Sequence, residues 1–273
     1  MKTILVATDF SPKARLATEV AISLAHQFKS DIHFLNVFHT PVNWSKLPKE
    51  QEGRFKEVKA KIGAAKAMLT ELETEAKQKG LNTSSFLSYD HENMNVLQHI
   101  QSHKHDLVVI GAHSRLTISD VLFGSVAINI IKNSPVSVLM VDEVDKFTSV
   151  KSILVAVDPD SNVVEFIKKV SNLFPTSDVK IKAFSVRSGA EKESEKMLEG
   201  LNEFIRRKTA KNVTYETVNA ASVEEGIIEK ANGSEGDLLV IGSNRFNKVA
   251  DYLRGHVFPS VSSRVRKPLV ILK

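Results

Sequence analysis

The stretch KTILVATD at residues 2–9 decides the fold, because it returns as KSILVAVD at residues 151–158, an offset of 149 (151 − 2). A second stretch, DLVVIG at residues 106–111, returns as DLLVIG at residues 237–242. Each of these is followed by another glycine 13 residues after its own last residue, Gly124 in one case and Gly255 in the other. Apolar strands recur in many chains, but a shared aspartate and a shared glycine spacing indicate a duplicated unit.

Within each copy the apolar residues switch between continuous short runs and helical spacing, which is typical of βαβ units around a parallel sheet buried on both faces. We therefore predict an α/β fold of two tandem, doubly wound, five-stranded domains. The boundaries are a first domain at 1–142, a linker at 143–150 and a second domain at 151–273. The expected strands are 3–8, 31–38, 84–89, 106–111, 136–141, 152–157, 180–186, 213–218, 237–242 and 269–272. The expected helices are 12–28, 54–78, 96–103, 126–132, 163–173, 193–208, 224–230 and 257–266.

The composition excludes several classes of protein. A chain of 273 residues with 42% apolar and 25% charged residues has the balance of a globular protein. No apolar run approaches the roughly 20 residues that span a bilayer, and the first residues lack a signal-peptide core, so we expect a cytoplasmic protein without membrane contact. The chain has no cysteine, which excludes disulfides and thiol catalysis. Its net charge of +5 is dispersed, and the two dense basic runs, 206–208 and 264–267, lie at expected helix ends, so nucleic-acid binding is not expected.

Polar and glycine residues gather where the strands of the first copy end. Parallel sheets bind ligands outside the carboxyl ends of their strands, where helix N-termini point at the ligand. Asp9 ends the first strand, Gly111 ends the fourth, and Gly124-Ser125 precedes the last helix, with the Ser114 hydroxyl between them. These residues could hold a ribose and phosphates. The alternative is that Asp9 and Ser125 only cap helices and the glycines only make turns.

The combination resembles the universal stress protein family over nearly the whole length of both copies. Gly111-Ala112-His113-Ser114, nine residues and then Gly124-Ser125 match the phosphate loop of its ATP-binding members, except that Ser114 replaces a glycine. The resemblance implies an adenine-nucleotide site for ATP, with or without magnesium, in which Asp9 and Val37 face the ribose and adenine. The site residues that it implies are Ala7, Thr8, Asp9, Val37, Gly111, His113, Ser114, Gly124, Ser125 and Val126.

The second copy departs further from that pattern. It has Arg245 where the family has a glycine and His256 where the family has serine or threonine, and Pro159-Asp160 follow its aspartate, Asp158. We therefore expect this domain to bind no nucleotide and to serve as a structural partner.

Two other features have a structural and a functional interpretation. Trp44, the sole tryptophan, lies in an excursion at 40–52 and is expected to fold back on the core more readily than to contact a ligand. His99 and His103 lie one helical turn apart, with His105 close in sequence, a spacing that can bind zinc. A solvated helix surface is the expected role of these histidines, because no carboxylate stands at a suitable offset.

The sequence thus favours a stress-response regulator that binds ATP in its first domain and is not primarily catalytic, although slow ATP hydrolysis stays open. The alternative is a ligand-free interaction protein in which both sites are degenerate. A metal-dependent hydrolase is a third candidate, for which no ligand set is visible. The closing strands, 136–141 and 269–272, would each be an exposed sheet edge, so we expect them to pair in an intramolecular pseudo-dimer, and further homodimers stay open.

Overall fold

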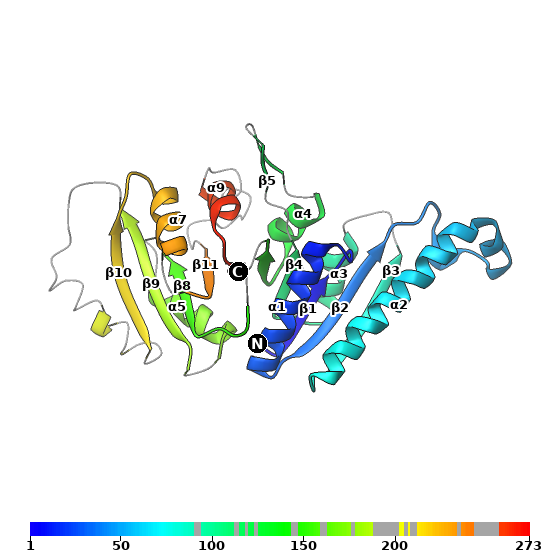
Figure 1. Cartoon of the computed structure of the whole chain (residues 1–273), viewed down its shortest axis with the longest axis horizontal. Coiled ribbons are helices and arrows are strands. Elements are labelled where there is room, and N and C mark those ends of the chain that lie inside the picture. The colour runs from blue at the N-terminus through cyan, green and yellow to red at the C-terminus, as the bar shows by residue number, and fades with distance from the viewer. Residues whose placement is uncertain are drawn as a thin grey trace.

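The computed structural model describes residues 1–89, 94–111, 115–117, 120–122, 125–142, 147–158, 163–175, 178–187, 202–204, 207, 212–233, 236–242 and 257–273. Strands and helices alternate along the chain, and ten strands form one sheet (Figure 1). The predicted α/β class is confirmed. None of the helices in these ranges combines the length and apolar character needed to cross a bilayer.

The first half, residues 1–142, supplies five strands of the sheet and four α-helices. Its elements are β1 (Thr3–Ala7), α1 (Pro12–Phe28), β2 (Asp31–Phe38), α2 (Lys56–Gln78), β3 (Thr83–Tyr89), α3 (Met94–Ser102), β4 (Leu107–Gly111), α4 (Ser125–Asn133) and β7 (Ser137–Val141).

The second half, residues 151–273, repeats this order. Its described elements are β8 (Ser152–Ala156), α5 (Val163–Leu173), β9 (Lys180–Arg187), β10 (Val213–Asn219), α7 (Val223–Gly233), β11 (Leu238–Ile241), α9 (Val257–Arg264) and β12 (Leu269–Ile271). Most of the helix predicted at 193–208 lies outside the described residues.

The two closing strands pair with each other. The strand order is β10-β9-β8-β11-β12-β7-β4-β1-β2-β3, and every adjacent pair is parallel except β12 and β7, which are antiparallel. Val270 lies opposite Leu139, and these two residues hold equivalent places in the two halves. Because equivalent residues face each other, the halves are related by a local two-fold axis at this pair. The closing strands thus cover each other's edges, as the sequence predicted.

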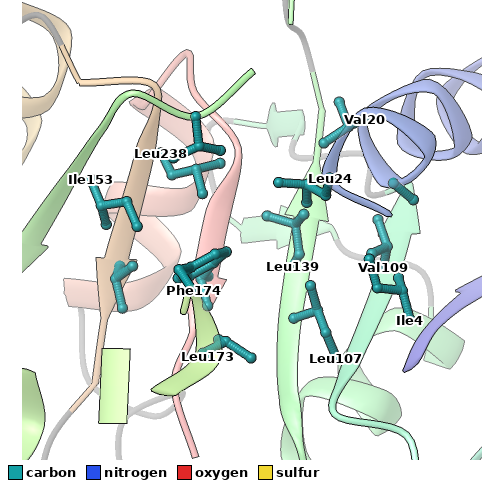
Figure 2. Close-up of a cluster of buried hydrophobic side chains, with 14 of the residues drawn as sticks. Ile4, Val20, Leu24, Leu107, Val109, Leu139, Ile153, Leu173, Phe174 and Leu238 are labelled. Carbon is teal, nitrogen blue, oxygen red and sulfur yellow. The ribbon is translucent and has the colours of Figure 1, made fainter. Parts of the chain in front are cut away.

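Side chains alternate between two cores along each strand, as a sheet covered on both faces requires. Ile4 and Val6 of β1 belong to the core under α1, α2 and α5, whereas Leu5 belongs to the core under α3, α4, α7 and α9. The first of these cores runs through both halves. Figure 2 shows Leu24 and Leu139 on one side of it and Phe174 on the other.

Helix α1 connects the halves on that face. It begins behind Ser11, whose hydroxyl accepts the N–H of Ala14, and Pro12 occupies its first turn. Near its other end the amide of Gln27 donates to the carbonyl of Val150 (2.7 Å) and accepts the N–H of Val150 (2.7 Å). Phe28 contacts Phe174 with ring centroids 5.6 Å apart. The start of the second half is therefore fixed against α1 by paired hydrogen bonds and an aromatic contact.

The structure also contains short elements that the sequence pattern did not predict. A hairpin of β5 (Arg115–Thr117) and β6 (Asp120–Leu122) lies between β4 and α4 and projects beyond the sheet (Figure 1). The excursion before α2 contains two 3₁₀ helices, η1 (Trp44–Lys46) and η2 (Lys49–Phe55). The ring of Trp44 lies 6.3 Å from that of Phe55, so its aromatic contact is within the excursion itself.

Candidate functional site

The turn after β1 holds Asp9 in a fixed, exposed position. The N–H of Thr8 donates to the carbonyl of Leu35 on β2 (2.9 Å), and the buried Thr8 hydroxyl accepts the N–H of Phe10 (3.0 Å). Phe10 has φ 62°, which is uncommon for a residue with a side chain, and Ser11 donates its N–H to Asp9 Oδ1 (2.9 Å). Ser11 caps α1, so Asp9 is not the helix cap. The carboxylate of Asp9 stays exposed at the end of the strand.

Asn36 fixes this turn from the neighbouring strand. Its amide nitrogen donates to the carbonyl of Thr8 (2.8 Å), and the side chain is buried. Its amide oxygen is buried without a hydrogen-bond partner among the described residues. In the sequence, the sign of this role is an asparagine in the otherwise apolar end of β2, and it was not among the predicted site residues.

Gly111 is needed for contact with α1. A Cβ at this position would lie 2.5 Å from the carbonyl carbon of Lys13 and 2.6 Å from the nitrogen of Ala14. These are backbone atoms that cannot rotate away, so only glycine lets the first turn of α1 approach the end of β4. The sequence predicts Gly111 as part of a phosphate site, and the structure shows in addition that its missing side chain makes room for the backbone of α1.

Lys13 and Asp142 connect the first turn of α1 to the end of β7. The Lys13 ammonium lies 2.5 Å from Asp142 Oδ1 and donates to the Asp142 carbonyl (2.9 Å). Both side chains are mostly shielded from solvent, with 18% and 26% of their surfaces exposed. This ion pair joins the start of α1 to the end of β7, at the same edge of the sheet as Asp9.

Six of the ten predicted nucleotide-site residues lie at this edge, together with the backbone of a seventh, Ser125. Ala7 ends β1 and is followed by Thr8 and Asp9, and the flanking strands contribute Val37 from β2 and Gly111 from β4. Helix α4 runs back toward β7 and begins at the same edge with Ser125, and the side chain of Val126 in its first turn is 44% exposed. His113, Ser114, Gly124 and the side chain of Ser125 lie outside the described residues.

The corresponding edge of the second half has lost the fixing contacts. Val157 keeps the backbone bond, from its N–H to the Phe184 carbonyl (2.9 Å), but it has no hydroxyl where the first half has Thr8. Ser185 occupies the place of Asn36 and bonds the hydroxyl of Tyr215 instead (2.8 Å). A Cβ on Gly242 would meet the ring of Phe166, 2.7 Å away, and not a helix backbone. Arg245 and His256, on which the prediction of a degenerate site rests, lie outside the described residues.

The repeated aspartates, Asp106 and Asp237, have a structural role at the opposite edge. Asp106 Oδ2 accepts the N–H groups of Lys2 (2.5 Å) and Thr3 (3.0 Å). Asp237 Oδ2 accepts those of Lys151 (2.7 Å) and Ser152 (2.8 Å). In each half the carboxylate before one central strand therefore holds the start of the neighbouring strand.

The expectation of a solvated helix surface is wrong for two of the three histidines. His105 is buried and His99 is partly buried, whereas His103 is exposed. His33 of β2 joins them, with its Nδ1 3.0 Å from Nε2 of His105. No group of three metal-ligating side chains that could hold an ion occurs within the described residues.

The comparisons with known proteins agree on one family. The model of the universal stress protein family matches residues 1–142, and no curated protein matches the chain. A universal stress protein from Archaeoglobus fulgidus DSM 4304 is 17% identical, with coverage of 99% of this chain and 96% of that one at a TM-score of 0.72. A candidate universal stress protein from Pseudomonas aeruginosa UCBPP-PA14 is 14% identical, with coverage of 100% and 93% at a TM-score of 0.60.

A shorter structure, a universal stress protein in complex with cAMP, is 22% identical, with coverage of 51% of this chain and 96% of that one at a TM-score of 0.42. At their identities the two full-length likenesses show the fold. Membership of the family rests on the family model, because this model matches more than half of the 273 residues. The chain therefore belongs to the universal stress protein family.

Proposed function

We propose that the first half binds an adenine nucleotide, ATP in preference to GTP, at the edge formed by the ends of β1, β2 and β4 and the start of α4. We further propose that the protein acts in the stress response as a regulator, not primarily as a catalyst. The observation that carries the proposal is the exposed Asp9 carboxylate on a turn fixed by Thr8, Phe10 and Ser11. A group held so rigidly can accept hydrogen bonds from a ribose without first being ordered.

The neighbouring residues suit the other parts of a nucleotide. Ala7 and Val37 are partly exposed apolar residues beside Asp9, and Val126 exposes an apolar side chain across the edge, where a base could pack. The start of α4 provides the positive end of a helix dipole for phosphates. His113, Ser114, Gly124 and Ser125 complete this site by the family resemblance. A magnesium ion that accompanies ATP would be coordinated by the phosphate oxygens.

The second half has a different part in this proposal. It is a structural partner at 151–273, joined by the linker 143–150 to the nucleotide domain at 1–142. Its edge lacks the hydroxyl and the amide that fix Asp9, since Val157 and Ser185 replace Thr8 and Asn36. We propose that the two domains stay docked through β7 and β12 as an intramolecular pseudo-dimer.

Calorimetry of the full chain with ATP and with GTP tests the nucleotide proposal. We expect one ATP per chain with a dissociation constant on the order of micromolar to millimolar, and weaker binding of GTP. Asp9→Ala should weaken ATP binding roughly tenfold, as expected for the loss of hydrogen bonds to a carboxylate. The matched variant Asp158→Ala, at the same place in the second half, should leave the affinity unchanged.

Three results would contradict the proposal. No heat with ATP at millimolar concentration would favour the ligand-free interaction protein. Two nucleotides per chain would show that the second half also binds. Equal losses in Asp9→Ala and Asp158→Ala would show that neither aspartate is specific to a first-half site.

A further inference from the structure

Four histidines and a phenylalanine pack together at the edge of the sheet opposite Asp9. His33 lies near the start of β2, Phe86 lies on β3, His99 lies on α3, and His103 and His105 lie in the segment between α3 and β4. We call the four histidines the histidine cluster. The rings of His99 and His103 are stacked 4.0 Å apart, and both are in contact with Phe86, at 4.4 and 5.1 Å. The end of α3 is thus held to the sheet by imidazole rings as well as by Ile100, which is buried in the core.

The contact between His33 and His105 requires that at least one of the two rings is neutral. Nδ1 of His33 and Nε2 of His105 are 3.0 Å apart, so one nitrogen must carry a proton and the other must accept it. A second proton would place two N–H donors against each other. The Nε2 of His99 is buried without a partner among the described residues, so a proton added there would gain no acceptor. At His105 the backbone of Ile100 acts in the opposite direction and raises the pKa, but the effect of burial is larger.

The electrostatic surroundings act in the same direction. Burial, followed by the neighbouring imidazoles, lowers the pKa of both His99 and His105 to about 4, and burial also lowers the pKa of His33. Two carboxylates oppose this: Asp31 acts on His33, and Asp106 acts on His105. The carboxylate of Asp106 is already engaged by the backbone of β1, and these two acids do not offset the effect of burial.

The second half has an ion pair at two of the equivalent positions. The strand registers and the shared aspartates place Lys230 where the first half has His99, and Glu216 where it has Phe86. The Lys230 ammonium lies 2.5 Å from Glu216 Oε1. Gly236 stands at the place of His105. At this place α7 therefore has an ion pair to the sheet and no imidazole ring.

We propose that the histidine cluster is a proton-sensitive latch, which holds α3 against the sheet at neutral pH and releases it in mildly acidic solution while α7 stays in place. Released histidines take up protons near pH 6.5, whereas packed ones resist them. The released form therefore binds more protons between pH 6.5 and about 4, and the packed form loses stability as the pH falls through that window.

Release of α3 has a consequence at the other edge of the sheet. Helix α3 contacts α4, which begins at the proposed nucleotide site. Acid should therefore weaken nucleotide binding as well. This consequence rests on the proposed function, whereas the latch itself can be tested without any nucleotide.

Amide hydrogen exchange of the full chain at pH 7, 6 and 5, corrected for the intrinsic pH dependence of exchange, tests the latch. The opening of α3 should increase on the order of tenfold from pH 7 to pH 5 for each of His99 and His105, while α7 serves as the internal control. The double variant His99→Gln/His105→Gln should abolish most of this increase. The matched control His26→Gln, at an exposed histidine in the last turn of α1, should retain it.

A direct titration of the imidazole groups by NMR keeps the proposal testable if the double variant does not fold. We expect the signals of His99 and His105 to titrate well below pH 6.5, together with amide shifts in α3. Titration near pH 6.5 without a change in α3 would overturn the proposal, as would equal acid response of α3 and α7.

Discussion

The two halves of the protein have the same order of strands and helices, but they differ in the residues at both ends of their strands, the carboxyl edge and the amino edge of the sheet. At the carboxyl edge, the first half fixes Asp9 with the Thr8 hydroxyl and the Asn36 amide, whereas the second half has Val157 and Ser185 there. At the amino edge, the first half has the histidine cluster and the second half has the ion pair of Lys230 and Glu216. The strands that carry these residues keep the same registers. The apolar strands are thus alike in the two halves, whereas the residues at the two ends of these strands differ.

The features that both halves keep are therefore those on which folding depends. Each half has an aspartate that holds two N–H groups of a neighbouring strand, and a glycine into whose side-chain space a helix packs. The closing strand of each half also pairs with that of the other half, β7 with β12. Substitution of the shared glycines or aspartates should therefore lower the free energy of unfolding in either half, by an amount that depends on the contact that is lost.

Separation of the halves should have the largest effect. Residues 1–142 expressed alone would expose the edge of β7, a strand that is buried along its whole length in the full chain, together with the part of the core that continues into the second half. An open apolar edge strand promotes association, so we expect this fragment to dimerise or aggregate. Sedimentation velocity of the fragment, with the full chain as control, measures this. A well-behaved monomer with unchanged amide exchange along β7 would show that the edges do not need each other.

Alanine at the two shared glycines should distinguish a backbone contact from a side-chain contact. Gly111→Ala forces a Cβ against the backbone of Lys13 and Ala14, whereas Gly242→Ala meets the ring of Phe166, which can turn. We expect the free energy of unfolding to fall by about 3 kcal/mol in the first case and about 1 kcal/mol in the second. Urea unfolding measures both values.

Gly63 provides the control for the glycine pair. It lies on α2 with open space where a Cβ would stand, so Gly63→Ala should stabilise the protein by about 0.5–1 kcal/mol. If Gly111→Ala proved as mild as Gly242→Ala, the first turn of α1 would be able to move away from β4.

Removal of the shared aspartates should have a smaller and similar effect in both halves. Asp106→Ala and Asp237→Ala each leave two N–H groups at the start of a strand without their acceptor. We expect a loss of about 1–3 kcal/mol for each, and a smaller loss for asparagine, whose amide oxygen still accepts. Chemical denaturation compares the four variants. A clear loss in one half with none in the other would mean that only one aspartate fixes its strand.

The sequence by itself determined the duplicated α/β plan and nearly all of its elements. A parallel strand buried on both faces must be apolar throughout, so β1, β4, β8 and β11 were visible as continuous runs, and α1 was visible through Pro12 and its periodic apolar face. The open edges of the closing strands also predicted their pairing, because exposed apolar edges must be covered. Asp9 and its place at a strand end followed from the same local pattern.

Contacts between distant residues were decided only by the tertiary structure. The reason for Gly111 is the backbone of α1, which is almost 100 residues earlier in the chain, and no local pattern reports such a distance of approach. Asn36 appeared as a polar exception in a strand until the carbonyl of Thr8 was found beside it. The histidine cluster combines His33 with His99, His103 and His105, and the spacing of the last three in the sequence indicated a solvated surface or a metal. Burial and the neutral state that burial imposes depend on what packs against a side chain, and this is set by the fold as a whole.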